Sequence, residues 1–412
     1  MRTLGGVPQP TLQARHARAA VAAVFLTNGA LFANVIPRYP AIKAELELSN
    51  AAWGAALAAF PLGALIAGLF AATLITRLRS SRMAAVGIVA LAVALLGVSL
   101  APTAVILAMV FFLAGAIDSV VDVAQNAHGL RVQRLYRRSI VNSFHGLWSV
   151  GAVIGGLMGA AAAGLDVPMT VHLTVAAVIF SAVALVAYRS LLPGPEDAER
   201  RSAEPTADPN ASAPPRPRGL GSVPRASVLA LAVLGLLAVS GALVEDAGSS
   251  WSAIYMRGSL GADAATAGLA FVALSVAMTV GRLTGDRAVD RFGQATVARL
   301  GGLLTAAGMG LALAVPTIPT TLIGFAVAGL GVATLIPAAF QAADEVPGLS
   351  SGVGLTVVSW LLRVGFLLSP PLVGLIADAT SLRVGLLLVV AGGVATFLCG
   401  GVLAGRRERS HL

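Results

Sequence analysis

The sequence predicts an all-α integral membrane protein with twelve transmembrane helices, arranged as two pseudo-symmetric six-helix bundles. Apolar residues make up 57% of the 412 residues and charged residues only 11%, whereas a soluble domain has about 25% charged residues. The chain contains twelve apolar stretches, each close to the roughly 20 residues that a helix needs to cross a bilayer. One polar, proline-rich segment at 190–224 separates them six and six.

The apolar stretches predict helices rather than a barrel. In lipid the backbone has to bond to itself, so a spanning chain forms helices or a closed barrel. Barrel strands alternate in polarity over segments of about 10 residues, whereas these stretches are longer and apolar throughout. The predicted spans are 17–38, 52–76, 84–101, 103–128, 139–164, 168–189, 226–254, 265–286, 295–315, 317–343, 350–378 and 382–403.

The two halves of the chain repeat. Sliding one over the other by 214 residues pairs Gly54 with Gly268 and Arg77 with Arg291, and it superposes spans and loops. Parallel six-helix repeats around a central site are typical of transporters. We therefore divide the chain into an N-terminal bundle at 1–189, a cytoplasmic linker at 190–224 and a C-terminal bundle at 225–412. The linker composition is that of a solvated, flexible segment.

The distribution of basic residues predicts the orientation. Only four of them fall in the loops opposite the termini, namely Arg38, Lys43, Arg257 and Arg383, and Arg363 lies inside a span. The others gather on the side of both termini, which the positive-inside rule assigns to the cytoplasm. This placement explains the net charge of +9 better than nucleic-acid binding does. Residues 1–16 have no apolar core, so we expect no cleavable signal peptide.

The sequence carries no enzyme motif. Its one cysteine, Cys399, allows no intramolecular disulfide, and we find no cluster of His and Cys that suggests a metal. There is no Gly-Lys-Ser/Thr loop for phosphate. We expect neither an enzyme nor a cofactor. A membrane enzyme acting on a lipid-linked substrate would need acids or histidines clustered at one membrane face, whereas here they are spread over several spans.

A loop between the eighth and ninth spans carries a family motif. Residues 285–293 read Gly-Asp-Arg-Ala-Val-Asp-Arg-Phe-Gly. A glycine, an aspartate–arginine pair and a second glycine resemble the loop signature of the major facilitator superfamily, and with the six-plus-six layout the resemblance covers nearly the whole chain. The first-half loop departs from the signature, since Thr76 stands at the place of the aspartate and Arg79 at that of the second glycine.

Two further stretches, 143–149 and 246–255, resemble a bacterial branch related to fucose-type sugar permeases. The resemblance implies a monomeric multi-pass protein of the bacterial inner membrane, in which spans 1, 4, 7 and 10 line a central cavity. It implies transport of a small organic solute, with proton-coupled, sugar-like symport favoured. Proton-driven efflux of a drug or metabolite, and a non-transporting sensor, are the alternatives. The acid that those permeases carry on the first span is absent here.

Ionisable residues within spans are candidates for proton coupling, because a charge at mid-membrane costs about 2.5–3.5 kcal/mol. Asp118 and Asp122 are four apart and share a helical face, and two nearby carboxylates repel one another, which favours a proton on one of them. Glu245 in the seventh span and His145 in the fifth complete the set. Alternatively, Asp122 pairs with Arg131 or another loop arginine, and His145 is a structural hydrogen-bonding residue.

Solute contacts are expected from polar groups of the spans. Arg363 stays charged, so it could hold an anionic solute or pair with an acid such as Glu245. Asn28 and Asn34 offer neutral hydrogen bonds, although they could equally join helices. The substrate-binding candidates are Asn28, Asn34, Asp118, Glu245, Gln341, Trp360 and Arg363.

A cytoplasmic gate is the third expected site. Arginines and acids gather at the cytoplasmic ends of spans 8 and 10, where ion pairs could lock the protein while it faces outward. Alternatively, these charges only set the orientation of the protein in the membrane and have no gating role. The gate candidates are Arg77, Asp286, Arg287, Asp290, Arg291, Asp344 and Glu345.

Overall fold

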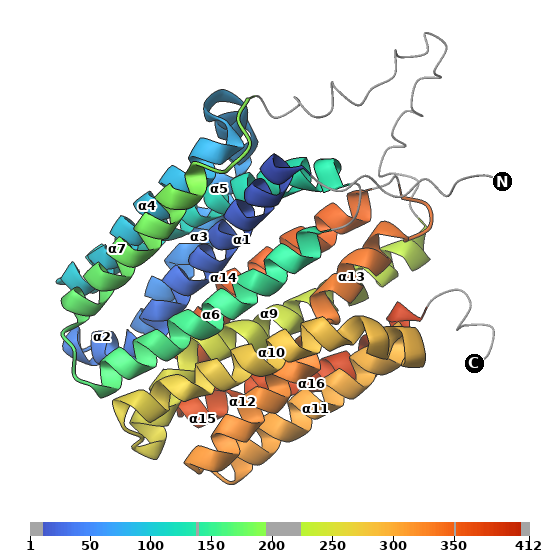
Figure 1. Cartoon of the computed structure of the whole chain (residues 1–412). Coiled ribbons are helices and arrows are strands. Elements are labelled where there is room, and N and C mark those ends of the chain that lie inside the picture. The colour runs from blue at the N-terminus through green and yellow to red at the C-terminus, as the bar shows by residue number, and fades with distance from the viewer. Residues whose placement is uncertain (1–10, 137–139, 195–223, 350–351, 405–412) are drawn as a thin grey trace.

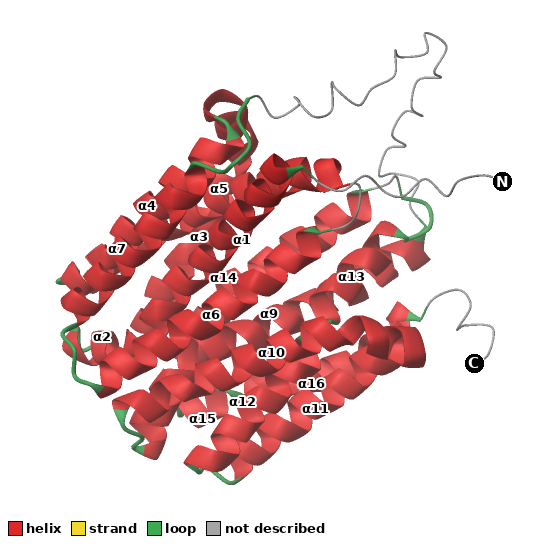
Figure 2. Cartoon of the chain, in the orientation of Figure 1, coloured by secondary structure: helices red, strands yellow, loops and turns green. Residues whose placement is uncertain are grey.

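The computed structural model describes residues 11–136, 140–194, 224–349 and 352–404. This part of the chain is almost entirely helical and contains no strand (Figure 2). It holds twelve helices, some of them interrupted, that are long and apolar enough to cross a membrane. The twelve-span prediction is therefore confirmed. Most of the predicted linker, from 195 to 223, lies outside the described residues.

The helices form two sets. The first set consists of α1 (Leu12–Val35), η1 (Ile36–Arg38), α2 (Tyr39–Glu45), α3 (Asn50–Leu78), α4 (Ser80–Leu96), η2 (Gly97–Leu100), α5 (Ala104–Tyr136), α6 (Val141–Gly164) and α7 (Met169–Tyr188). The second consists of α9 (Arg225–Leu260), α10 (Ala264–Phe292), α11 (Gln294–Ala314), α12 (Ile318–Val332), α13 (Leu335–Asp344), α14 (Val353–Ala379), α15 (Leu382–Gly385), α16 (Leu387–Cys399) and η4 (Gly400–Leu403).

The two bundles lie side by side with their helices roughly parallel (Figure 1). One end of the molecule carries α2 and α15, and we call it the α2 end. The other carries α13, the start of α1 and the end of α10, and we call it the α13 end.

Two proline residues lie at breaks within the membrane-spanning segments Leu12–Glu45 and Ile318–Asp344. Proline lacks the N–H that would bond the carbonyl four residues earlier, and its ring crowds that carbonyl. Pro37 accordingly lies in η1, between α1 and α2, and Pro337 follows the break between α12 and α13 at residues 333–334. The first and tenth spans therefore each bend.

The bundles meet along two pairs of helices, α3 with α14 and α6 with α10. Glycine permits the close approach at each. A Cβ on Gly54 of α3 would meet the backbone of Pro370 and Pro371, and one on Gly268 of α10 would meet Ala160 and Pro37. The 214-residue repeat pairs these two glycines, so the two halves use equivalent positions to build the two interfaces.

Hydrogen bonds tie the bundles together at the α2 end. The Asp378 carboxylate, near the end of α14, accepts bonds from the backbone N–H groups of Asn50 (2.8 Å) and Ala51 (2.8 Å) and from the Asn50 side chain (2.9 Å). An acid of one bundle thus caps the first turn of α3 in the other, where the helix dipole favours negative charge. The Trp53 indole also donates to the Ser250 carbonyl across the interface (3.5 Å).

Candidate functional site

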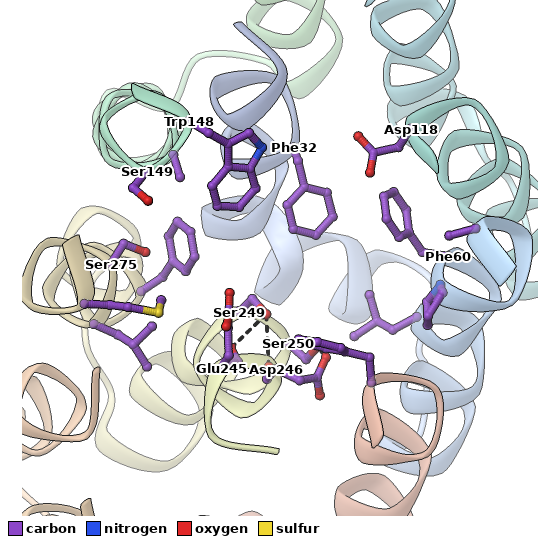
Figure 3. A pocket seen from close by; sticks show the side chains of 18 of the residues that line it. Phe32, Phe60, Asp118, Trp148, Ser149, Glu245, Asp246, Ser249, Ser250 and Ser275 are labelled. Carbon is purple, nitrogen blue, oxygen red and sulfur yellow. Dashed lines mark hydrogen bonds between the residues drawn. The ribbon is translucent and has the colours of Figure 1, made fainter. Parts of the chain in front are cut away.

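A cavity of about 330 Å³ lies between the bundles, which is in the usual range for a small-molecule site. Helices α1, α2, α3, α5 and α6 line it from the first bundle, and α9, α10 and α14 from the second. Most of its wall is apolar, with phenyl rings such as Phe32 and Phe60 facing the interior (Figure 3). Polar groups face one another across it, Asp118 and Trp148 from the first bundle, Glu245 and Asp246 from the second.

The first bundle places a chain of three hydrogen-bonded side chains in this cavity. The Trp148 indole N–H of α6 donates to Asn28 Oδ1 of α1 (2.7 Å), and Asn28 Nδ2 donates to Asp118 Oδ1 of α5 (2.7 Å). The indole bond fixes which way the Asn28 amide points, so that its NH₂ faces the carboxyl group. The structure thus brings together Asn28 and Asp118 from the sequence-based set and adds Trp148, which was not among our candidates.

The second bundle contributes an ion pair. Arg282 Nη2 of α10 lies 3.3 Å from Glu245 Oε2 of α9, and both side chains are half-buried. Arg282 Nη1 also lies 3.5 Å from Ser149 Oγ of the first bundle. The sequence left open whether Arg363 holds an anionic solute or pairs with an acid such as Glu245. The structure pairs it with Arg282 instead, because α10 lies next to α9 while Arg363 extends toward the first bundle.

Asp246 follows Glu245 on α9 and has a different environment. Its side chain is only 8% exposed. The Ser250 hydroxyl donates to its Oδ1 (2.8 Å), and its Oδ2 has no hydrogen-bond partner among the described residues. Adjacent helical positions point about 100° apart, so one acid meets the cation of α10 while its neighbour turns toward α14.

Arg363 lines the cavity from α14 and is exposed to it. Its Nη1 lies 3.9 Å from where a Cβ on Gly68 of α3 would stand, and Ser119 Oγ of α5 lies 3.1 Å from the same point. The side chain therefore crosses from the second bundle to the first. In the described part of the chain it makes neither a hydrogen bond nor an ion pair.

A second polar network continues from the cavity toward the α13 end. Asp122, one turn beyond Asp118, accepts from Asn126 Nδ2 (3.0 Å) and Gln125 Nε2 (3.3 Å). Asn126 Oδ1 in turn lies 3.1 Å from His145 Nε2. The alternative partner of Asp122 does not pair with it, since Arg131 is fully buried and donates to the Pro193 carbonyl (2.8 Å).

Three of the substrate-binding candidates lie outside the cavity. Asn34 is buried within the first bundle, where its amide oxygen accepts from His172 Nε2 (2.9 Å) and its NH₂ group donates to the Ala30 carbonyl. Gln341 lies on α13 beside Gln294 (3.5 Å), and Trp360 is 47% exposed on α14. The sequence marked these residues as candidates because they are polar or aromatic side chains within apolar spans. It could not show which neighbouring helix packs against the face that each of them occupies.

The gate candidates gather at the α13 end without engaging one another. In the part of the chain that the structure describes, no ion pair joins Arg77, Asp286, Arg287, Asp290, Arg291, Asp344 and Glu345 to each other. Asp344 instead accepts a bond from the Gly352 N–H (2.8 Å). The described residues also contain no group of three or more His, Cys, Asp or Glu side chains that could hold a metal ion.

Comparisons with known proteins agree with this architecture. The family model described as Major Facilitator Superfamily matches residues 21–252 and 246–411. The chain is 32% identical over 367 residues to a protein of Sinorhizobium fredii named "Uncharacterized transporter y4wD", which covers 88% of this chain and 92% of that protein. It is 29% identical over 391 residues to "Membrane protein MosC" of Rhizobium meliloti. That alignment covers 94% of this chain and 90% of the Rhizobium meliloti protein.

Two solved structures share the fold. One is a bacterial homologue of the human lysosomal transporter Spinster, in an inward-facing and unoccupied conformation, with a TM-score of 0.71 and 14% identity over 96% of this chain and 98% of that one. The other is the nucleoside transporter NupG, with a TM-score of 0.68 and 12% identity over 95% and 98%. At these identities the likeness extends to the fold alone.

Proposed function

Because the chain belongs to the Major Facilitator Superfamily and encloses a cavity between its bundles, we propose that it is a proton-coupled secondary transporter. It moves a small organic solute by alternating access and does so as a monomer, since one chain supplies every wall of the cavity. Its location is a bacterial inner membrane with both termini cytoplasmic, as the distribution of basic residues favours.

The environment of Asp118 is the observation that supports proton coupling most directly. Its carboxyl group lines the cavity and is bonded by the neutral amide of Asn28, and no ion pair neutralises it among the described residues. A carboxyl group in a membrane without a cation is costly when ionised, and a proton removes that cost. Glu245 differs because Arg282 already neutralises it.

The network beyond Asp118 gives a route for that proton. Asp122, Asn126 and His145 are hydrogen-bonded in series toward the α13 end. Asp122 and His145 are both titratable side chains, and they lie between the cavity and the face that we assign to the cytoplasm. We therefore propose that protons pass between Asp118 and the cytoplasm along these side chains.

The lining favours a solute with a sizeable apolar part over the sugar-like solute that the sequence suggested. A sugar needs many free hydrogen-bonding groups, yet most of the cavity hydroxyls already donate within their own helices. Ser149, Ser249 and Thr279 donate to carbonyls three or four residues earlier. The remaining wall is mainly aromatic and aliphatic.

The two ends of the molecule differ in how firmly they join the bundles, as alternating access requires. Asp378 and Trp53 hold the bundles together at the α2 end, while the gate candidates at the α13 end are not paired with one another. This combination corresponds to a state closed toward the α2 side. In the opposite state the gate charges would pair and the α2-end bonds would break.

The proposal is tested in proteoliposomes with an imposed pH gradient. Internal pH is recorded while organic acids, sugars, amino acids, nucleosides and cationic dyes are added. We expect solute-dependent proton flux that is lost in Asp118→Asn and kept in Asp263→Asn, an acid on the surface of α10. The sign of the flux separates symport from efflux by antiport. Solute movement without proton flux would refute the coupling, and no movement of either would favour the sensor.

A further inference from the structure

The charged groups of the cavity are not all paired. Glu245 and Arg282 neutralise each other at 3.3 Å. Asp118 and Asp246 have neutral hydrogen-bond donors, Asn28 and Ser250 respectively. Arg363 alone, among the charged side chains that line the described cavity, has neither a hydrogen bond nor an ion pair.

An unpaired guanidinium inside a membrane protein calls for a ligand. Arginine keeps its charge and presents a planar set of N–H donors that matches a carboxylate with two parallel bonds. Arg363 is near the middle of α14, the eleventh residue of a helix that runs from Val353 to Ala379. It is therefore far from either end of the helix, where water or headgroups would satisfy it.

Given the proposed transport function, on which this step rests, we infer that the solute is an organic anion whose carboxylate is bound by Arg363. The cavity of about 330 Å³ has room for roughly a dozen non-hydrogen atoms, at about 30 Å³ for each water-sized unit. Phe32, Phe60 and the other rings facing the interior (Figure 3) would enclose the rest of the molecule. The solute class is thus a small carboxylic acid with an apolar or aromatic body.

One acid competes with the solute for this cation. Asp122 lies within electrostatic range of Arg363, although not close enough for an ion pair. Its carboxylate is bonded by Gln125 and Asn126, and these bonds hold it in place on the first bundle. Removing the negative charge of Asp122 would therefore leave Arg363 more strongly attractive to an anion, whereas removing Arg363 would abolish the attraction.

The test is ligand binding to the purified full-length protein in nanodiscs, followed through the shift in unfolding temperature that a bound ligand causes. Benzoate and cyclohexanecarboxylate are compared with benzyl alcohol, cyclohexylmethanol and benzylamine. We expect a carboxylate to bind and its neutral and cationic counterparts not to. Arg363→Gln should weaken carboxylate binding about 10- to 100-fold, the range for loss of charge-assisted hydrogen bonds.

Two further variants separate recognition from a structural role. Asp122→Asn should tighten carboxylate binding several-fold, an effect opposite in sign to that of Arg363→Gln and not expected from damage to the fold. Arg82→Gln removes an exposed arginine of α4 outside the cavity and should leave carboxylate binding unchanged. If Arg363→Gln fails to fold, Arg363→Lys keeps the charge without the planar fork and should bind more weakly than wild type.

The inference fails if a neutral or cationic member binds as well as the carboxylates, if no carboxylate binds, or if Arg363→Gln binds them as wild type does. Proton-coupled movement of a neutral solute in proteoliposomes would overturn the inference and leave the transport proposal standing. Binding of a carboxylate that depends on Arg363, without any transport, would support the inference and overturn the transport proposal.

Discussion

At the scale of single residues, the Asn28 amide connects the Trp148 indole N–H to the carboxyl group of Asp118 in the cavity. Trp148 holds the Asn28 oxygen, so the NH₂ group is directed at Asp118. Phenylalanine at position 148 would keep the ring and remove the N–H, which leaves the amide free to turn. A net hydrogen bond is worth about 1 kcal/mol, so we expect Trp148→Phe to lower the transport rate about fivefold.

The matched comparison is Trp360→Phe. The sequence nominated Trp360 for the solute site, but the structure places it on the exposed surface of α14, outside the cavity. Its removal should leave initial transport rates unchanged at saturating solute. Equal losses in the two variants would contradict the arrangement described here, because they would show that the indole N–H of Trp148 has no special role.

Sequence reasoning identified part of this site. Asp118, Glu245 and Arg363 stood out because a charge in an apolar span is conspicuous, and all three line the cavity. Arg282 was missed as a cavity residue, since it lies near the cytoplasmic end of the predicted span 265–286 and was grouped with the charges of the following loop. The partners could not be predicted, because they depend on which helices are neighbours rather than on spacing within one helix.

At the scale of elements, the turn between α3 and α4 carries a strained residue. Arg79 has φ 72° and ψ 141°, and its repeat partner Gly293, between α10 and α11, has φ 80° and ψ 154°. This region of backbone space is close to glycine-only and costs other residues about 1–3 kcal/mol. We therefore predict that Arg79→Gly stabilises the protein by about 1 kcal/mol, measured by thermal unfolding in detergent.

Arg82→Gly supplies the control for that substitution. Arg82 is an exposed residue inside α4, where the same replacement should destabilise by about 1 kcal/mol because glycine is a poor helix former. Opposite signs for two arginine-to-glycine changes three residues apart are expected. Destabilisation by Arg79→Gly would mean that its side chain contributes more than its backbone costs.

The bond between α14 and α3 gives a second prediction for elements. Asp378→Asn removes the charge that caps α3 across the interface, so the α2 end should open more readily. Spin labels at Glu45→Cys and Ser259→Cys, on opposite bundles and in a Cys399→Ser background, report the separation. We expect the population of the longer distance to grow several-fold, as about 1 kcal/mol of lost capping implies.

Asp263→Asn is the control for the α2 end. Asp263 caps α10 within its own bundle by accepting from the Thr266 N–H (2.9 Å) and hydroxyl (2.6 Å), and these bonds hold the pKa of Asp263 below its usual value. Its loss should cost helix stability and leave the distance between the labels unchanged. A distance change in this variant, or none in Asp378→Asn, would contradict an interbundle latch.

At the scale of the whole molecule, the 214-residue repeat accounts for more of the architecture than any single motif does. The 214-residue offset pairs Gly54 with Gly268, and the structure shows that these two glycines lie at the two interfaces between the bundles. The number of spans and the two-bundle architecture were predictable because lipid permits few solutions. The bends at Pro37 and Pro337 were not anticipated, although proline chemistry accounts for both.

The two bundles place an acid and a cation of different character on either side of one cavity. Among the described residues, Asp118 of the first bundle is in no ion pair, and neither is Arg363 of the second. When the bundles rock, the surroundings of both groups change together. A proton on Asp118 and a solute on Arg363 can therefore favour the same movement, which is how a proton gradient would drive the solute.

The central claim is that Asp118 couples protons to solute movement. It is tested most directly by comparing two modes of transport in Asp118→Asn proteoliposomes, with a transported carboxylate as solute. We predict that exchange of labelled for unlabelled solute at equal pH continues at a rate close to wild type, while accumulation driven by a pH gradient is lost. Retained accumulation, or equal loss of both modes, would contradict the claim.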